Sequence, residues 1–314
     1  MISSDLRHSI LIQPAAEGAN KLYIVSGYAS PSMVSWQYDT LKNMGIESIS
    51  INLIIGMTAA EGITVPNHKG FIELANAIDG FNCQYLYQNM PVHSKLYVWE
   101  KNGEPYKAFV GSANYTQRAF GKCQREIMSE CDPREALDYF YEIDKDTIYC
   151  TESEVDDFIV IINPIQELKK DDSNKLTLSL LMNNGKGDIG KKSSLNWGQR
   201  GKREPNQAYI PYPSAKRKKG FFPVKGNDAS APHFTVVTDD MKSLVLRVEQ
   251  QGNKAITTPE KNSKLGEYFR YRLGLPNGAF VTKEDLIRYG RTDVDFYKID
   301  DEQYYMDFSV HTED

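Results

Sequence analysis

Residues 93–114 of this 314-residue chain read H-S-K-L-Y-V-W-E-K-N-G-E-P-Y-K-A-F-V-G-S-A-N. The Asn-Gly pair in the middle predicts a tight turn between two short strands. Residues two apart in an extended strand point to the same side, so His93 and Lys95 should face one way together. The hairpin brings the chain back, and Ser112 and Asn114 can then face the same space. The segment therefore predicts one small site with an imidazole, an ammonium, a hydroxyl and a carboxamide.

These groups suit the hydrolysis of a phosphodiester, which needs a nucleophile and donors for the charged oxygens. We expect His93 to attack phosphorus and form a phosphohistidine, because a neutral imidazole is nucleophilic near neutral pH. Lys95 and Asn114 would hold the phosphate oxygens, as a metal ion does in other nucleases. A carboxylate should fix the tautomer of His93, and Glu126, on a strand expected at 124–128, is the candidate. The chemistry would then need no metal ion and no other cofactor.

A simpler interpretation is a surface histidine and lysine beside an ordinary glycine turn. The remaining histidines offer no competing motif, because each lacks a lysine two residues later: His8, His68, His233 and His311.

The pattern H-x-K followed by G-S-x-N resembles the phospholipase D superfamily, which includes lipid-cleaving enzymes and metal-independent nucleases. The chain departs from the family pattern at Glu100, where the family has Asp, and in a longer spacing to Gly111. It holds one copy of the motif, whereas members with two copies use the second histidine as general acid. The resemblance therefore implies a homodimer in which His93 of each subunit contributes to one shared site.

The composition is that of a globular protein, with 40% hydrophobic residues, 25% charged residues and a net charge of −5. No apolar run approaches the roughly 20 residues that span a bilayer, and the N-terminus does not read as a signal peptide. The four cysteines include no C-x-x-C pair, which favours reduced thiols over disulfides or a zinc site. We expect a cytoplasmic protein that does not bind membranes.

The two halves of the chain predict different folds. In the first half, apolar strands such as 22–28 and 48–55 alternate with amphipathic helices, one of them capped by Asp132, which predicts an α/β sheet covered by helices. In the second half, short strands separated by Gly and Pro dominate, one of them at 280–281, and a helix capped by Thr282 is expected at 282–289. This pattern predicts a mainly-β barrel. A polar stretch separates them. The expected parts are a domain at 1–170, a linker at 171–176 and a domain at 177–314.

Basic residues are concentrated in the second half. Residues 1–170 hold 14 Lys and Arg against 22 Asp and Glu, whereas residues 171–314 hold 23 against 20. The excess is densest at 183–225, with 11 basic and two acidic residues. Such a segment suits a polyanionic partner, although a solvated basic loop would have the same composition.

Two clusters in this half combine planar hydrogen-bonding side chains with aromatic ones. Arginine pairs well with the major-groove edge of guanine, and asparagine or glutamine with that of adenine. The four basic residues at 216–219 suit contacts to phosphate. The candidate base-contacting residues are Gln199, Arg200, Arg203 and Asn206 in the first cluster, and Arg270 and Arg272 in the second.

The second cluster, residues 265–274, would place its two arginines on one side if it formed a strand. Its aromatic residues Tyr268, Phe269 and Tyr271 are better explained as barrel core than as contacts to DNA.

Both clusters, with N-W-G-Q-R at 196–200 and P-N-Q-A-Y-I-P at 205–211, resemble the restriction endonucleases of the NgoFVII type. That family joins a phospholipase D-like nuclease domain to a DNA-binding pseudobarrel similar to the plant B-three domain. The resemblance implies that the clusters are two arms that grip the major groove. Some relatives work with a helicase-like ATPase partner. This chain contains no Walker-type phosphate loop, so any use of ATP would belong to that partner.

The sequence thus predicts a restriction endonuclease that cuts double-stranded DNA at a specific sequence. Two other interpretations remain: a phosphodiesterase that acts on lipids, and a DNA-binding protein without catalysis. The basic second half favours DNA over lipid, and the intact catalytic residues favour an enzyme.

Overall fold

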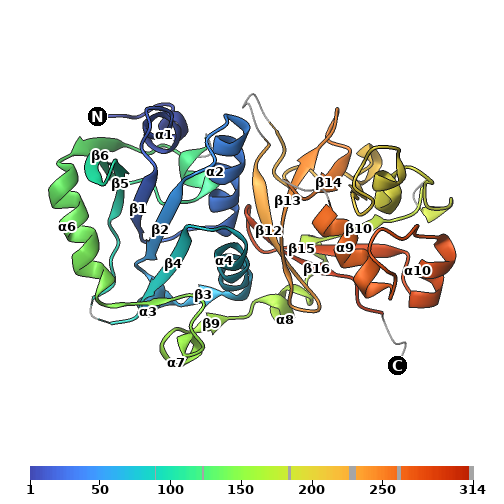
Figure 1. The fold of residues 1–314 in the computed structure, drawn as a ribbon. Helices are drawn as coiled ribbons and strands as arrows, with labels where there is room; N and C mark the ends of the chain where they lie inside the picture. The colour runs from blue at the N-terminus through green and yellow to red at the C-terminus, as the bar shows by residue number, and fades with distance from the viewer. Residues whose placement is uncertain (89, 122–123, 183–184, 226–230, 260–262, 311–314) are drawn as a thin grey trace. The chain divides into compact units, whose positions relative to one another are not determined.

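The computed structural model describes residues 1–88, 90–121, 124–182, 185–225, 231–259 and 263–310 (Figure 1). The chain divides into two compact units, an N-terminal unit (Met1–Asn163) and a C-terminal unit (Pro164–Asp314). Residues 171–176, expected as a linker, instead lie inside the C-terminal unit, where Asp172–Asn174 form a 3-10 turn and Lys175 begins a strand. The polar composition of this stretch reflects its exposure at the surface of a folded unit.

The N-terminal unit is built on a seven-stranded sheet of order β7-β6-β5-β1-β2-β4-β8. Strands β1, β2 and β4 are parallel, while β5, β6 and β7 form an antiparallel meander beside β1. The expected turn joins β5 to β6, with positive φ values of 56° at Asn102 and 81° at Gly103. The strands are β1 (Lys21–Ser26), β2 (Ser50–Ile55), β4 (Phe81–Leu86), β5 (Lys95–Lys101), β6 (Glu104–Gly111), β7 (Met128–Cys131) and β8 (Thr147–Tyr149).

Helices cover both faces of this sheet (Figure 1). Along β1, Leu22 and Ile24 belong to the core shared with α2 (Pro31–Asn43) and α4 (Val65–Ala77), whereas the alternate residues pack under α6 (Pro133–Asp144). Asp132 caps α6 as its sequence predicts, accepting hydrogen bonds from the backbone of residues 134 and 135. The smaller elements are η1 (Arg7–Ile12), α1 (Gln13–Ala16), α3 (Thr58–Glu61), β3 (Ile63–Thr64), α5 (Gln117–Phe120), α7 (Val155–Phe158) and β9 (Ile161–Ile162).

The C-terminal unit is a mainly-β structure around a seven-stranded sheet of order β10-β15-β16-β12-β13-β14-β11. All pairs of neighbouring strands are antiparallel except β12 and β16. The strands are β10 (Lys175–Ser179), β11 (Ile210–Pro211), β12 (His233–Thr238), β13 (Ser243–Glu249), β14 (Ala255–Thr257), β15 (Asp293–Lys298) and β16 (Gln303–Asp307). The helical elements are α8 (Ile165–Leu168), η2 (Asp172–Asn174), η4 (Ser194–Gln199), η5 (Ser214–Lys216), α9 (Ser263–Arg272) and α10 (Lys283–Tyr289).

Two local expectations for this unit are wrong. Residues 280–281 do not form a strand, because the side chain of Asn196 bonds both the N–H and the C=O of Val281 in place of a neighbouring strand. Residues 265–272 are helical within α9, not extended. Leu265 and Phe269 are four residues apart on the buried face of that helix, and Tyr271 is 67% exposed instead of lying in the core.

Candidate active site and nucleic-acid interface

His93 lies just before β5, and its side chain is exposed. Two glycines let the chain pass close to it. A Cβ on Gly27 would lie 3.1 Å from Cδ2 of His93, and one on Gly56 would lie 2.0 Å from the carbonyl oxygen of Val92. At Gly56 the backbone of the histidine segment leaves no room for a side chain, and at Gly27 a side chain would make a tight contact with the imidazole.

Lys95, the first residue of β5, is buried against His93. Its Nζ lies 2.9 Å from Nδ1 and 3.1 Å from Nε2 of His93, and it also donates to the backbone oxygen of His93. Burial lowers the pKa of Lys95, and the charge of Glu126 opposes that shift in part. A cation thus lies where a phosphate bound at His93 would need one.

Asn114 is fixed by its oxygen. Its Oδ1 accepts hydrogen bonds from the backbone N–H of Tyr28 at 3.2 Å and from Oγ of Ser26 at 3.4 Å. It also lies next to the glycine beneath His93, because a Cβ on Gly27 would be 3.5 Å from the same oxygen. With Oδ1 occupied, the amide nitrogen of Asn114 is the group left to donate to a substrate.

Ser112 and Glu126 form a second part of the site. Ser112 donates from Oγ to the carboxylate of Glu126 and accepts from the backbone N–H of Ile127 at 3.0 Å. Glu126 lies in the loop before β7, so the strand expected at 124–128 begins only at residue 128. Across the described ranges no hydrogen bond joins Glu126 to His93; its partners are Ser112 and Gln124. The predicted contact to the imidazole is not made within one chain.

Tyr28 is a neighbour of His93 that the sequence motif did not predict. Its ring meets the imidazole of His93 edge-on, with centroids 5.9 Å apart and an interplanar angle of 80°. Its hydroxyl donates to the carboxylate of Glu61 at 2.9 Å. Tyr28 therefore joins three residues of this region: His93, Asn114 and Glu61. The signal in the sequence was S-G-Y directly after the first strand, an aromatic residue at the end of a strand of a parallel pair.

The two clusters expected to contact DNA differ in exposure. In the first cluster, Arg200 and Arg203 are exposed and Gln199 is half-buried, donating to the backbone oxygen of Gly278 at 2.9 Å. Asn206 is buried, and its Oδ1 accepts from the N–H of Gly278 at 2.6 Å. Asn206 therefore holds the loop at 278, and its contact with a base stays a prediction from the sequence.

Arg270 is also structural. Its side chain is fully buried and donates to the backbone oxygens of Ala279 at 2.8 Å, Gly266 at 3.1 Å and Leu195 at 3.1 Å. A fourth bond reaches the oxygen of Pro205 at 3.3 Å. Its guanidinium is enclosed by these backbone carbonyl groups, so the structure supports a structural role for Arg270, and its contact with DNA stays a prediction from the sequence.

Arg272 forms a two-pronged ion pair with Asp239, at 2.8 and 2.7 Å. Tyr268 and Tyr289 accept from the same guanidinium at 2.7 and 2.6 Å. These bonds raise the pKa of Arg272 against the opposing effect of its burial. The second cluster thus packs the C-terminal unit, and a contact of Arg272 with DNA stays a prediction from the sequence.

A different segment offers exposed amides. The turn between β13 and β14, residues 250–254, reads Q-Q-G-N-K and is exposed except for half-buried Asn253. It lies beside β11, because Tyr212 donates its N–H to the oxygen of Lys254 at 2.8 Å. Short loops with Gln and Asn give a weak sequence signal, so the sequence did not single out this turn.

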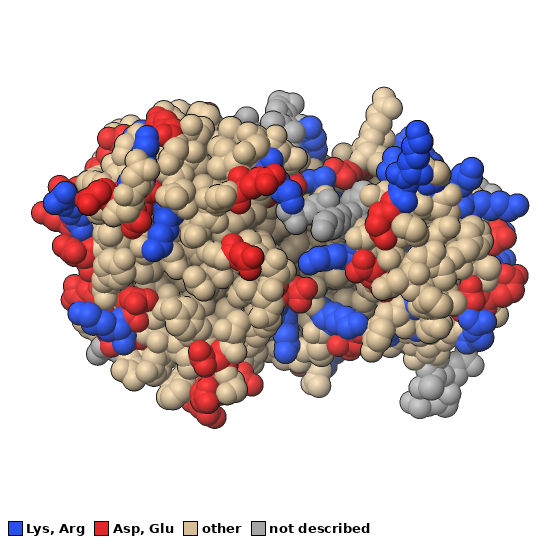
Figure 2. Space-filling view, in the orientation of Figure 1, with Lys and Arg blue, Asp and Glu red and all other residues tan. Residues whose placement is uncertain are grey.

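Exposed basic residues surround the first cluster. Figure 2 shows Lys and Arg side chains gathered over the segment drawn in yellow in Figure 1. Of the 11 basic residues at 183–225, all are exposed except Arg217, which is half-buried. The electrostatic surface predicted from composition is therefore available to a polyanion.

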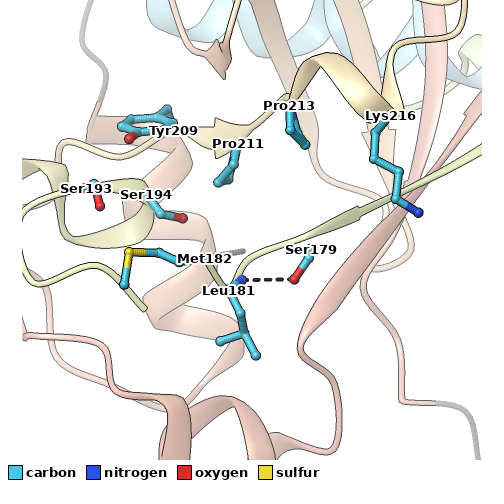
Figure 3. Close-up of a pocket in the computed structure, with 9 residues that line it drawn as sticks. All are labelled: Ser179, Leu181, Met182, Ser193, Ser194, Tyr209, Pro211, Pro213 and Lys216. Carbon is cyan, nitrogen blue, oxygen red and sulfur yellow. Dashed lines mark hydrogen bonds between the residues drawn. The ribbon is translucent and has the colours of Figure 1, made fainter. Parts of the chain in front are cut away.

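A pocket of about 430 Å³ lies between the loop after β10 and the segment around β11 (Figure 3). Tyr209, Pro211 and Pro213 line it from one side, and Leu181 and Met182 from the other. The ring of Tyr209 also meets that of Trp197, with centroids 5.5 Å apart. The pocket therefore borders the first cluster.

Among the described residues, no helix is both long and apolar enough to cross a bilayer. Within the same ranges, no three His, Cys, Asp or Glu side chains are grouped as metal ligands.

An imidazole, an ammonium, a hydroxyl and a carboxamide at one end of an α/β sheet, followed by a basic mainly-β unit, define a two-part protein that acts on a polyanionic phosphodiester. Residues 4–157 match the family model of the NgoFVII restriction endonuclease N-terminal PLD domain. Residues 168–300 match that of the NgoFVII C-terminal B3-like DNA-binding domain.

The chain belongs to the NgoFVII family of restriction endonucleases. This confirms the predicted resemblance and the predicted fold class of each half. The protein is accordingly a phosphodiesterase that acts on DNA, with a DNA-binding domain after its nuclease domain.

Solved structures with similar folds include NucT from Helicobacter pylori, at 14% identity and a TM-score of 0.33 over 47% of this chain and 96% of that one. A phospholipase D family member, Nuc from Salmonella typhimurium, is 16% identical, with a TM-score of 0.31 over 42% of this chain and 82% of that one. Polyphosphate kinase from Porphyromonas gingivalis is 14% identical, with a TM-score of 0.30 over 46% of this chain and 22% of that one. No curated protein sequence matches the chain.

Proposed function

We propose that this protein cuts double-stranded DNA at a specific sequence through a phosphohistidine on His93, without a metal ion. The observation that carries the proposal is the contact of Lys95 with both ring nitrogens of His93, at 2.9 and 3.1 Å. Asn114 adds a donor whose orientation is fixed by its two bonds to the chain after β1. Together they supply charge and hydrogen bonds that a phosphoryl group needs as it is transferred.

In the first step a ring nitrogen of His93 forms a bond to phosphorus while the bond from phosphorus to one deoxyribose oxygen breaks. The departing oxygen takes up a proton. In the second step water attacks the phosphohistidine, its proton is removed, and the imidazole is regenerated with a phosphate left on the DNA end. Lys95 and Asn114 hold the non-bridging oxygens through both steps.

The proton for the departing oxygen requires a group opposite His93, and we propose that a second copy of the chain supplies it through its own His93. One imidazole cannot stand on both sides of phosphorus, and within one chain Glu126 is bound to Ser112 and not to His93. In a homodimer with a shared site, the second copy of the same chain would supply both the second imidazole and a carboxylate for the ring of His93.

Recognition of the DNA sequence is assigned to the C-terminal unit. The exposed members of the first cluster, Arg200 and Arg203, remain candidate base contacts, and Gln199 remains a weaker one. In place of the second cluster we propose the turn at 250–254, whose glutamines and asparagine suit adenine edges. A separate ATPase partner and a cytoplasmic location remain predictions from the sequence.

Digestion of a defined plasmid in excess EDTA, followed by sequencing of the fragment ends, tests the proposal. We expect discrete fragments whose ends share one sequence. Cutting that stops in EDTA and returns with added Mg²⁺ would refute the metal-independent chemistry, and random ends would refute sequence specificity.

A further inference from the structure

The loop between β10 and β11 carries an arginine–tryptophan stack, made of Trp197, Arg200 and Arg203. The guanidinium carbon of Arg200 lies 3.7 Å from the centroid of the Trp197 ring, and that of Arg203 lies 4.6 Å from it. Both distances are within the range of a cation–π interaction. The tryptophan thus holds two exposed arginines at one place on the surface.

The ring of Trp197 is itself fixed to the folded unit. It packs edge-on against Tyr209, at an interplanar angle of 74°. Tyr209 donates its N–H to the oxygen of Ser194 at 3.2 Å, and Gly198 donates to the oxygen of Gln207 at 2.7 Å. These bonds tie the two ends of the loop together, so the stack is anchored and not carried by a free chain.

Arg200 is held by one edge only. Its Nε donates to the backbone oxygen of Lys192 at 2.8 Å. Within the residues that the structure describes, Nη1 and Nη2 of Arg200 have no hydrogen-bond partner. These two nitrogens form the end of the guanidinium, and their spacing matches the O6 and N7 acceptors of guanine.

The other arginines of the two clusters lack this combination. Arg270 donates its hydrogen bonds to backbone carbonyl oxygens, and Arg272 donates to the carboxylate of Asp239, both inside the C-terminal unit. Arg203 is stacked less closely, and its Nη1 donates to Oε1 of Gln207 at 3.1 Å. Among these four arginines, only Arg200 combines a fixed Nε with two terminal nitrogens that make no hydrogen bond to the described residues.

Resting on the function proposed above, we propose that Arg200, positioned by Trp197, reads one guanine of the recognition sequence through its O6 and N7. Stacking and the bond to Lys192 orient the guanidinium before DNA arrives, so less side-chain freedom is lost on binding. A lysine at this position would keep the charge but not the planar pair of donors. The protein therefore recognises a sequence that contains at least one guanine.

The test is a selection of binding sites from a randomised duplex library by the full chain, compared between wild type and variants. Arg200→Ala and Arg200→Lys should each lose the preference for guanine at one position, by roughly 5- to 150-fold. Trp197→Phe should keep part of that preference and Trp197→Ala little of it. Thermal unfolding of each variant confirms that it is folded.

Lys202→Ala is the matched control, because Lys202 is exposed, basic and in the same loop. It should weaken binding to all sequences about equally and lower the salt dependence, as expected for a phosphate contact. Replacing the selected guanine with 7-deazaguanine, which lacks N7, should cost wild-type protein affinity and cost Arg200→Ala nothing further.

Two outcomes would overturn the proposal: a selected site without guanine, or an Arg200→Ala variant that loses affinity for all sequences equally. Either can occur while wild-type protein still cuts at one sequence, and the proposed function would then stand without this reading site. If the wild-type chain neither prefers nor cuts any sequence, the proposed function itself fails.

Discussion

The candidate active site around His93 in the N-terminal unit and the arginine clusters of the C-terminal unit were both predicted from short motifs. The structure agrees with the first prediction more closely than with the second. At the catalytic region, His93, Lys95 and Asn114 lie within one neighbourhood, as a hairpin requires. In the C-terminal unit, Arg270 and Arg272 lie inside the fold with their donors occupied.

The difference has a physical cause. A hairpin fixes which side chains meet, because strand geometry and a two-residue turn leave few alternatives. An arginine in an amphipathic helix can point to solvent or bond to buried carbonyls, and residue type does not decide between them. Four mutational predictions follow from this contrast, in order of decreasing effect.

The largest effect should come from His93→Ala. Without the nucleophile, DNA cutting should fall by on the order of 10⁴- to 10⁶-fold, while binding of the uncut sequence by the C-terminal unit is unchanged. Gel-shift and cleavage assays on the same duplex measure both. A variant that cuts at more than a hundredth of the wild-type rate would break the assignment of the catalytic region.

Removal of the Lys95 ammonium should lower the rate of DNA cutting by a smaller factor than removal of His93. We expect Lys95→Ala to lower the rate of cutting by roughly 10²- to 10³-fold, with little change in DNA affinity. Because the pKa of Lys95 is lowered by burial, the ammonium should lose its proton below the ordinary value of 10.5. The rate should therefore decline on the alkaline side at a pH below 10.5. A rate independent of pH up to that value would argue that Lys95 does not act through its charge.

Arg270→Ala tests whether this arginine has a structural role in the C-terminal unit. It should lower the free energy of unfolding of the C-terminal unit by about 3 kcal/mol or more, because several buried carbonyl groups lose their donor. Arg203→Ala, at an exposed arginine, should change it by no more than about 0.5 kcal/mol. Chemical denaturation of the two variants decides the matter. Equal, small losses would return Arg270 to the candidate DNA contacts.

The smallest effect should be on acid stability at Glu17. Hydrogen bonds from Lys107, Tyr106 and Gln13 lower its pKa from 4.5 to about 2. The ionised carboxylate therefore stabilises the fold fully above pH 4.5, and this contribution is lost as the pH falls toward 2. Glu17→Gln should lower the melting temperature slightly at pH 7 and not near pH 2.

Glu47→Gln serves as its control, because Glu47 is exposed and makes no hydrogen bond among the described residues. It should leave the melting temperature unchanged at both values. A Glu17→Gln difference that grows as the pH falls would have the wrong sign for this interpretation.

Much of the fold followed from the sequence. The asparagine–glycine turn, the alternating strands and helices before residue 163, and the capping of the helices at Asp132 and Thr282 were all predicted and are present. These features depend on local chemistry: backbone conformation, periodicity and the needs of a helix end.

The parts that were not predicted depend on residues far apart in the chain. Gly27 and Tyr28, directly after β1, reach His93 from some 65 residues earlier in the chain. Arg270 is buried by carbonyls from three other segments, at residues 195, 205 and 279. The spacing of Leu265, Tyr268 and Phe269 does contain the signal for the helix observed here.

The proposed mechanism requires that a ring nitrogen of His93 becomes bonded to phosphorus. Cleavage by the wild-type chain in EDTA, quenched rapidly with alkali, should trap a protein–DNA adduct, and mass analysis of the digested protein should place the phosphate on His93. An adduct on another residue, or cutting with no adduct at any time during turnover, would contradict it.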